Sequence, residues 1–118
     1  MPDDAAAQTE ETFGPTLTVT KVRDVEEALE LANATSYGLA GAVFSKRRGM
    51  EIARKLRSGM TSINAVQAFA AIPSLPFGGV GDSGFGRIHG EDGLRAFTRA
   101  QAVARQRFAA PIAVTSFR

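Results

Sequence analysis

The sequence predicts an α/β fold: a partial, open and mainly parallel sheet with flanking helices, a Gly/Pro-rich loop and a C-terminal strand. Strand-like and helix-like segments alternate over residues 17–64 with short links, which favours right-handed crossovers and parallel strands. The two helices of this stretch can cover little more than one face, whereas parallel sheets are normally covered on both. In the first strand, Leu17–Val22, β-branched and polar residues alternate.

The first helix is predicted over about residues 25–33. Asp24 stands three residues before Glu27, as in a capping box, so its side chain should accept a hydrogen bond from the Glu27 backbone N–H. Asn33 and Gly38 bracket the exit of this helix, as helix stops usually do. Its apolar stripe consists of Val25, Ala28, Leu29 and Ala32.

A second strand and helix follow at once. Leu39–Phe44 is continuously apolar, which is typical of a strand buried on both faces. Ser45 can cap a helix that ends at Ser58-Gly59, where the glycine would take the left-handed conformation. The apolar face of this helix holds Gly49, Ile52, Ala53 and Leu56, and Arg54, Lys55 and Arg57 point away. Met60–Asn64 reads as a third strand.

Beyond the third strand the regular pattern ends. Residues 65–90 contain six glycines and two prolines, which predicts a long loop without regular elements. Loops of this length inside a compact domain tend to be functional. A short helix is expected around Glu91–Thr98, with Leu94 and Phe97 facing inward, and a last strand over Ala102–Phe108.

Composition excludes several classes of protein. The 118 residues include no cysteine, which excludes disulfides, thiolate metal sites and a cysteine nucleophile. With His89 as the only histidine, we expect no metal site. There is no apolar run for a membrane span and no signal sequence, so the expected location is the cytoplasm. Residues 1–9 should be a flexible leader and residues 109–118 a tail.

The charges are unevenly placed along the chain. All twelve acidic residues lie at or before Asp92, and the remaining 26 residues carry only basic charge. This end of the chain could touch nucleic acid or another anion. Its arginines are not interleaved with aromatic residues or lysines, which favours a strand with outward-facing arginines, or a tail against an acidic partner, over nucleic-acid binding.

Two features resemble functional motifs, a dinucleotide-binding string and a lone histidine, but the residues around each favour a structural role. Residues 79–84 match G-x-G-x-x-G, but a dinucleotide site needs these glycines between a strand and a helix, with an acid about 20 residues further on. Pro76 precedes the motif and no acid occurs beyond Asp92. His89 could act as a general base, but its position before a helix favours a helix-entry residue.

An ordered set of short motifs carries a family resemblance. Glu10–Pro15 (EETFGP) stands directly before the first strand, and Leu75–Arg87 (LPFGGVGDSGFGR) forms the glycine-rich loop. Between and after them come Ala32-Asn33, Tyr37-Gly38-Leu39-Ala40, Val43-Phe44, Gly59-Met60, Ile63-Asn64, His89-Gly90 and Gly93–Phe97. Over residues 10–108 this set resembles the C-terminal portion of the catalytic domain of aldehyde dehydrogenases.

The resemblance assigns roles to three residues. In that family the residue matching Glu11 binds the ribose next to the nicotinamide, and the one matching Phe13 packs on the nicotinamide side of the cofactor, where a carboxylate and an apolar ring suit those tasks. The residue matching Phe77 lines the aldehyde channel. Residues 65–72 match a variable channel wall and are mostly apolar here, which suggests an apolar substrate in an intact enzyme. Many relatives have Asp where this chain has Ala65, which leaves the local loop geometry open.

The resemblance also implies what this segment does not contain. Family enzymes use NAD or NADP to oxidise an aldehyde to a carboxylic acid through a cysteine thiolate, with a glutamate as general base. Both groups and the nucleotide-binding domain precede this segment in family order. We therefore expect no catalytic residue here, no activity of the chain alone, and weak or no binding of NAD or NADP.

Two non-catalytic alternatives remain open. The chain could be an interaction module that uses a bare sheet face or edge to pair with itself or with a full-length relative, or it could associate with the missing N-terminal part of the enzyme. Family members oligomerise partly through the strand matching Ala102–Phe108, and an unpaired edge is a template for such pairing. The last alternative is nucleic-acid binding through the basic end, which predicts salt-sensitive retention on DNA.

Overall fold

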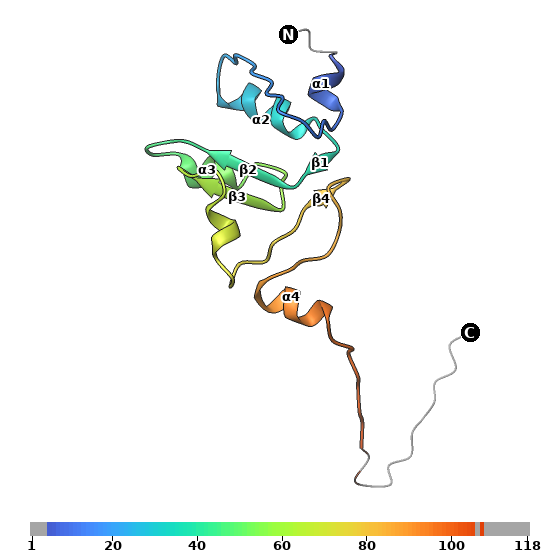
Figure 1. Cartoon of the computed structure of the whole chain (residues 1–118). Coiled ribbons are helices and arrows are strands. Elements are labelled where there is room, and N and C mark those ends of the chain that lie inside the picture. Colours follow the sequence, from blue (N-terminus) through green and yellow to red (C-terminus); the bar gives the residue numbers. More distant parts are fainter. Residues whose placement is uncertain (1–4, 106, 108–118) are drawn as a thin grey trace, which may run out of the picture.

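The computed structural model describes residues 5–105 and 107 and confirms the α/β class. In this part of the chain, β2 (Ala40–Val43) and β3 (Met60–Ile63) form a parallel pair, and β1 (Tyr37–Gly38) and β4 (Val80–Gly81) an antiparallel pair. The helices are arranged around these pairs (Figure 1): α1 (Ala6–Thr9), α2 (Val25–Asn33), α3 (Gly49–Ala53), the 3-10 helix η1 (Ala68–Ala71) and α4 (Gly90–Ala96). The expected parallel arrangement is thus present in β2–β3, beside a second, antiparallel sheet.

The unit β2–α3–β3 is the predicted parallel crossover. Its register runs from Ala40 opposite Met60 to Val43 opposite Ile63. Gly49 lets α3 approach β3 closely, because a Cβ at this position would stand 2.6 Å from Cγ2 of Ile63. Arg54, Lys55 and Arg57 face solvent as predicted.

The start of α3 differs from the prediction. Arg48 is the N-cap, and the Ser45 hydroxyl instead accepts a hydrogen bond from the Arg48 backbone N–H at 3.1 Å, so it holds the turn before the helix. Gly59 does not take the left-handed conformation. It is needed for close packing, since a Cβ there would overlap the backbone of Gly78.

Helix α2 forms as predicted. The Asp24 carboxylate accepts a hydrogen bond from the Glu27 backbone N–H at 2.8 Å, and Leu29 on the apolar stripe is buried. The Glu27 carboxylate in turn accepts from the Arg23 backbone N–H at 2.6 Å, so both ends of the capping arrangement are occupied. Gly38 does not end this helix, because it lies in β1.

Two predicted strands and one predicted burial are wrong in the described residues. Residues 17–22 form no strand, and Leu17 and Val19 are 85% and 77% exposed. Leu94 and Phe97 of the α4 region face solvent, at 70% and 85% exposed. Residues 102–105 and 107 form no strand either, and in Figure 1 the chain beyond α4 leaves the body of the molecule. Strand pairing and apolar burial both need a neighbouring element. Among the described residues no strand pairs with residues 17–22 or 102–105, and Leu94 and Phe97 stay mostly exposed.

The second strand is covered on one face only. Val43 is buried, but Ala40 and Ala42 are exposed, which corrects the prediction of a strand buried on both faces. The sparse covering predicted from the helix count is therefore observed.

At the ends of the chain, residues 6–9 of the expected leader form α1, which buries no side chain, and residues 109–118 lie outside the described part.

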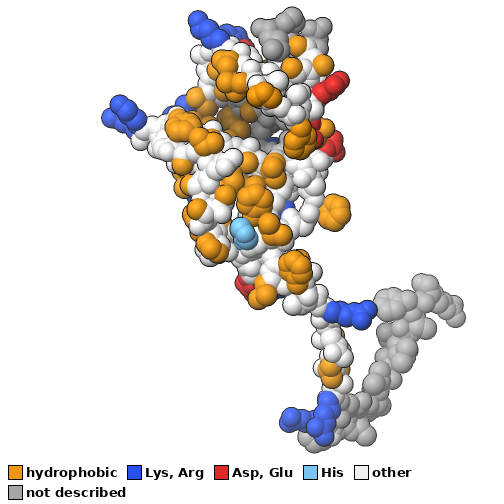
Figure 2. Space-filling view, in the orientation of Figure 1, with side chains coloured by type: hydrophobic (Ala, Val, Ile, Leu, Met, Phe, Trp, Pro, Cys, Tyr) orange, Lys and Arg blue, Asp and Glu red, His pale blue; other side chains and the backbone are white. Residues whose placement is uncertain are grey.

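The hydrophobic core is small. Among the described residues, the apolar side chains that are buried are Leu29, Val43, Met60 and Phe69. Figure 2 shows apolar side chains spread over the visible face, and the large exposed ones include Phe13, Phe44, Phe85 and Phe97. Exposed apolar surface on this scale marks a contact surface for another polypeptide or a liability to aggregate.

Candidate functional site

The glycine-rich loop is folded back on itself. The backbones of Phe77 and Ile88 exchange two hydrogen bonds, of 2.6 and 2.8 Å, and β4 pairs with β1. This corrects the expectation of a loop without regular elements. Arg87 holds the loop together by donating from Nη1 to the carbonyl oxygens of Gly79, at 2.8 Å, and Gly86, at 2.6 Å.

Two glycines of this loop, Gly78 and Gly79, allow close packing of the backbone. A Cβ on Gly78 would stand 2.5 Å from the Gly86 carbonyl oxygen, and one on Gly79 would stand 2.7 Å from Cβ of Ser83. After Gly81 the chain makes a turn and no helix. The G-x-G-x-x-G string therefore lacks the strand-to-helix geometry on which a dinucleotide pyrophosphate binds.

Phe77 lies in an aromatic row on one side of this loop. Its ring centroid is 6.2 Å from that of Phe69 and 5.8 Å from that of His89, in tilted arrangements suited to aromatic contact. His89 is the N-cap residue of α4, with φ of 64°, which confirms a helix-entry position. Phe77 also lines a groove of about 370 Å³ between the loop and the end of α4.

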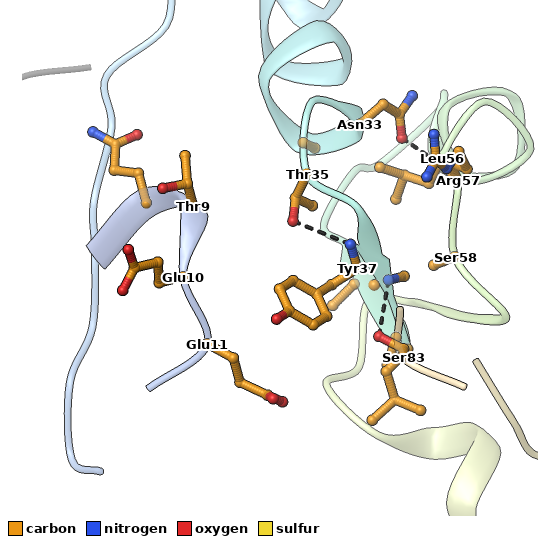
Figure 3. Close-up of a pocket in the computed structure, with 17 residues that line it drawn as sticks. Thr9, Glu10, Glu11, Asn33, Thr35, Tyr37, Leu56, Arg57, Ser58 and Ser83 are labelled. Atoms are coloured by element: carbon orange, nitrogen blue, oxygen red, sulfur yellow. Dashed lines mark hydrogen bonds between the residues drawn. The ribbon is translucent and has the colours of Figure 1, made fainter. Parts of the chain in front are cut away.

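Glu11 lines a different cavity. This space of about 490 Å³ lies between the N-terminal segment and the β1–β2 region (Figure 3). In the figure, the Glu11 side chain extends from the N-terminal segment and the Tyr37 ring projects into the space from β1. Two polar groups on the wall are already occupied by backbone, because Gly38 N–H donates to Ser83 Oγ at 3.0 Å and Tyr37 N–H to Thr35 Oγ1 at 3.2 Å.

The structure does not bring the three predicted site residues together. Phe13 is 97% exposed and does not line the cavity that Glu11 lines. Phe77 belongs to the groove beside α4. Glu11 and Phe77 thus line different cavities, and Phe13 lines neither.

Two asparagines tie segments that are distant in the sequence, and only Asn33 lines one of these spaces. The Asn33 amide donates from Nδ2 to Lys55 O at 2.9 Å and accepts at Oδ1 from Arg57 N–H at 2.7 Å, tying α2 to the α3–β3 link. The Asn64 amide makes the same pair of bonds with the backbone of Ser45, at 2.8 and 3.1 Å. Asn64 has φ of 54°, a conformation that asparagine tolerates better than most residues. An asparagine directly after a predicted helix or strand is the signal that could have identified both.

The strongest ionic cluster lies away from both cavities. Glu51 pairs with Arg48 at 2.8 Å and with Lys55 at 3.3 Å, and Arg48 also reaches Glu26 of α2 at 3.8 Å. The hydrogen bonds from Arg48 and then Lys55 lower the pKa of Glu51 to about 2, and the bond to Glu51 raises the pKa of Arg48. All these groups are exposed, so the cluster links α2 to α3 on the surface.

Metal and membrane sites find no support in the described residues. No group of three or more His, Cys, Asp and Glu side chains there could hold a metal ion. None of the helices in that part is long and apolar enough to cross a membrane.

Comparisons with known proteins are consistent with each other. The sequence model described as "Aldehyde dehydrogenase family" matches residues 1–103. A succinate-semialdehyde dehydrogenase (NADP+) from Deinococcus radiodurans is 48% identical over 102 residues, which cover 85% of this chain and 21% of that enzyme. The structure of an NAD-dependent aldehyde dehydrogenase from Sinorhizobium meliloti superposes with a TM-score of 0.86 at 33% identity, covering 95% of this chain and 22% of that one.

A second solved structure agrees. Betaine aldehyde dehydrogenase from Staphylococcus aureus, in complex with NAD+, gives a TM-score of 0.76 at 39% identity over 82% of this chain and 19% of that one. The present chain spans about a fifth of the length of the relatives it matches.

Proposed function

Because the chain belongs to the aldehyde dehydrogenase family, we propose that it is the C-terminal portion of the catalytic domain of an NAD(P)-dependent aldehyde dehydrogenase. It supplies parts of the cofactor side and the channel wall of an enzyme that oxidises an aldehyde to a carboxylic acid. The observation that carries this proposal is the match over residues 1–103 in a chain without any cysteine. Without a thiolate the covalent route has no attacking group, so the chain alone is inactive.

The cofactor and the substrate class are proposed for the intact enzyme. One relative is named for NADP+ and another was solved with NAD+, so either nucleotide is compatible with the family match. The channel wall over residues 65–72 carries η1, in which Phe69 is buried, and the remaining side chains of η1 are alanines. This wall favours an aldehyde with an apolar body. The absence of a spanning helix in the described part is compatible with a cytoplasmic enzyme.

Glu11 and Phe13 are proposed to contact the cofactor and Phe77 the aldehyde once the rest of the catalytic domain is present. The exposure of Glu11 and Phe13 supports this proposal, because neither side chain is used inside the described chain. In the intact enzyme a carboxylate can accept hydrogen bonds from both ribose hydroxyls, and an apolar ring can restrict the face of the nicotinamide.

A chimera tests these roles directly. Residues 10–103 of this chain replace the matching segment of the Deinococcus radiodurans enzyme, with which the chain is 48% identical. We expect an active chimera in which Glu11→Gln and Phe13→Ala raise KM for the cofactor about tenfold or more, a loss of about 1.4 kcal/mol in binding. Phe77→Ala should change KM for the aldehyde without changing KM for the cofactor.

Glu30→Gln on the exposed side of α2 is the matched control and should leave both constants unchanged. An active chimera in which the Glu11 and Phe13 variants bind the cofactor normally would contradict the assigned roles.

The bare apolar surface favours a second candidate function, a non-catalytic module that pairs with itself or with a full-length relative. Ala40 and Ala42 of β2 are exposed, as are the large side chains of Phe13 and Phe44. A monodisperse dimer or larger species on a sizing column supports this module, and a soluble monomer argues against it.

A further inference from the structure

We propose that the free edge of β2 is a docking site for one extended strand, and that this strand is residues 17–22 of a second copy of the chain. This inference rests on the second candidate function above, the non-catalytic pairing module. It names the partner of that module and the surface through which the two pair. It does not depend on the catalytic proposal.

The edge follows from the hydrogen-bond pattern of the parallel pair. The Val43 carbonyl oxygen accepts from the Asn64 N–H at 2.8 Å, so the backbone groups of Val43 point toward β3. Backbone groups of successive strand residues point to opposite sides, so those of Ala42 and Phe44 point away from β3. No strand lies on that side among the residues described, and Ala42 and Phe44 are both exposed. Such a row of unpaired groups is a template for an added strand.

A groove accompanies this edge along its whole length. The 490 Å³ cavity is lined by residues 39–42 of the strand region, and an adjoining space of about 280 Å³ is lined by Ala42, Val43 and Phe44. The opposite wall of the second space is the apolar stripe of α2. Its residues there are Val25, Ala28, Leu29 and Ala32. A groove between a helix and an edge strand fits an extended peptide, which gains main-chain bonds from the strand and pockets for alternate side chains.

The same chain carries a segment with the matching chemistry. Residues 17–22 make no backbone hydrogen bond to any other described residue, and their side chains are largely exposed. Their alternation places Leu17, Val19 and Lys21 on one face and Thr18, Thr20 and Val22 on the other. Leu17 and Val19 can therefore enter the groove together while the threonine hydroxyls meet water.

Each copy has one β2 edge and one such segment, so a reciprocal exchange closes into a two-fold dimer in which both β2 edges are paired. The segment could instead fold onto β2 of its own chain, but in this structure it is unpaired. The proposal is that residues 17–22 pair with β2 of a second copy. The experiment below distinguishes this dimer from a monomer in which the segment pairs with β2 of its own chain.

Proline variants of the full chain test the proposal, with mass measured by sedimentation velocity over a concentration series. Val19→Pro removes a donor and fixes φ in the entering segment. Ala42→Pro removes an N–H that points away from β3, and proline is tolerated at such an edge position. Ala42→Lys places a charge at the same exposed edge position and should block pairing without changing the backbone. This second variant keeps the test informative if the proline variant fails to fold. Val103→Pro lies in the segment that the family resemblance assigns to oligomerisation, so this variant tests the rival interface.

We expect a wild-type dimer, a dissociation constant raised at least about tenfold in the Val19 and Ala42 variants, and no change in Val103→Pro. A mixture of Val19→Pro and Ala42→Pro should recover partial association, because one intact segment then meets one intact edge. A monomeric wild type, with or without hydrogen-exchange protection of residues 17–22, overturns the proposal. So does a dimer that only Val103→Pro disrupts. An inactive chimera in the preceding experiment would leave these outcomes unaffected.

Discussion

Gly59 and Gly78 lie backbone against backbone, so closely that a Cβ atom on Gly59 would overlap the carbonyl oxygen of Gly78. Because the obstacle is backbone, a larger residue at position 59 must push the glycine-rich loop away from the start of β3. Gly59→Ala should lower the free energy of unfolding by about 1–3 kcal/mol, the usual cost of overpacking. Urea titration measures this change.

Gly14→Ala is the control, since the nearest atom to its added Cβ would be Cγ2 of Thr12 at 3.9 Å, an ordinary contact. If Gly59→Ala unfolded at the wild-type urea concentration, the two backbones would not be in contact in solution.

The Asn33 amide is predicted to be the main tie between α2 and the α3–β3 link. Asn33→Ala removes both the bond to Lys55 O and the bond from Arg57 N–H, and should destabilise the chain by about 1–3 kcal/mol. Asn33→Asp keeps the acceptor and loses the donor, so its effect should be smaller. Gln67→Ala, at an exposed position without a capping bond, is the reference. Equal stability of the Asn33→Ala and Gln67→Ala variants would disprove the tie.

Stability in acid should depend on Glu51. Its pKa is lowered from 4.5 to about 2 by Arg48 and Lys55, so the charged pair contributes stability above pH 4.5. That contribution is lost as the pH falls through about 2, where the folded chain finally takes up the proton. Between pH 4.5 and about 2, the unfolding free energy of Glu51→Gln should fall less steeply than that of the wild type. Added salt should reduce the difference between the two proteins, because Glu51 is exposed.

Urea titrations at a series of pH values would measure this effect, with Glu30→Gln as the control on α2. Wild type and Glu51→Gln losing stability in parallel would show that the ion pairs are not formed in solution.

The elements that the sequence predicts correctly are those determined by a few neighbouring residues. The Asp24–Glu27 cap, the stripe through Leu29 and the outward basic residues just after α3 all depend on local spacing, although α3 ends at Ala53, before the predicted Ser58-Gly59. Residues 17–22 and Phe97 instead need a partner surface, and in the described chain residues 17–21 and Phe97 are exposed. An alternating or periodic pattern predicts which face of an element is apolar. It does not predict whether the surface that covers this face belongs to the same polypeptide.

The candidate site shows the same division. Glu11, Phe13 and Phe77 were predicted from a family resemblance. In this chain Glu11 and Phe77 line different cavities, and Phe13 is exposed to solvent. Their convergence in an intact enzyme needs surfaces that this chain does not supply. The bonding partners of Asn33 and Asn64 could not be predicted, because each amide bonds the backbone of a segment 19 or more positions away in the sequence.

Nucleotide binding by the isolated chain should be very weak. Phe13 is 97% exposed and lies outside the cavity that Glu11 lines, so no two predicted groups hold one ligand. Titration calorimetry with NAD and with NADP should give a dissociation constant above about 1 mM, equivalent to less than about 4 kcal/mol of binding. Saturable heat at micromolar nucleotide would contradict the separation of these residues.

The central claim is that this chain provides walls of an aldehyde-oxidising site and no attacking group. It is tested most directly by following the appearance of reduced nicotinamide when the purified chain is mixed with an aldehyde and NAD or NADP. The account predicts a rate equal to that of a protein-free blank at every protein concentration. Turnover that rises in proportion to the chain, together with a covalent aldehyde adduct on one of its side chains seen by mass spectrometry, would contradict it.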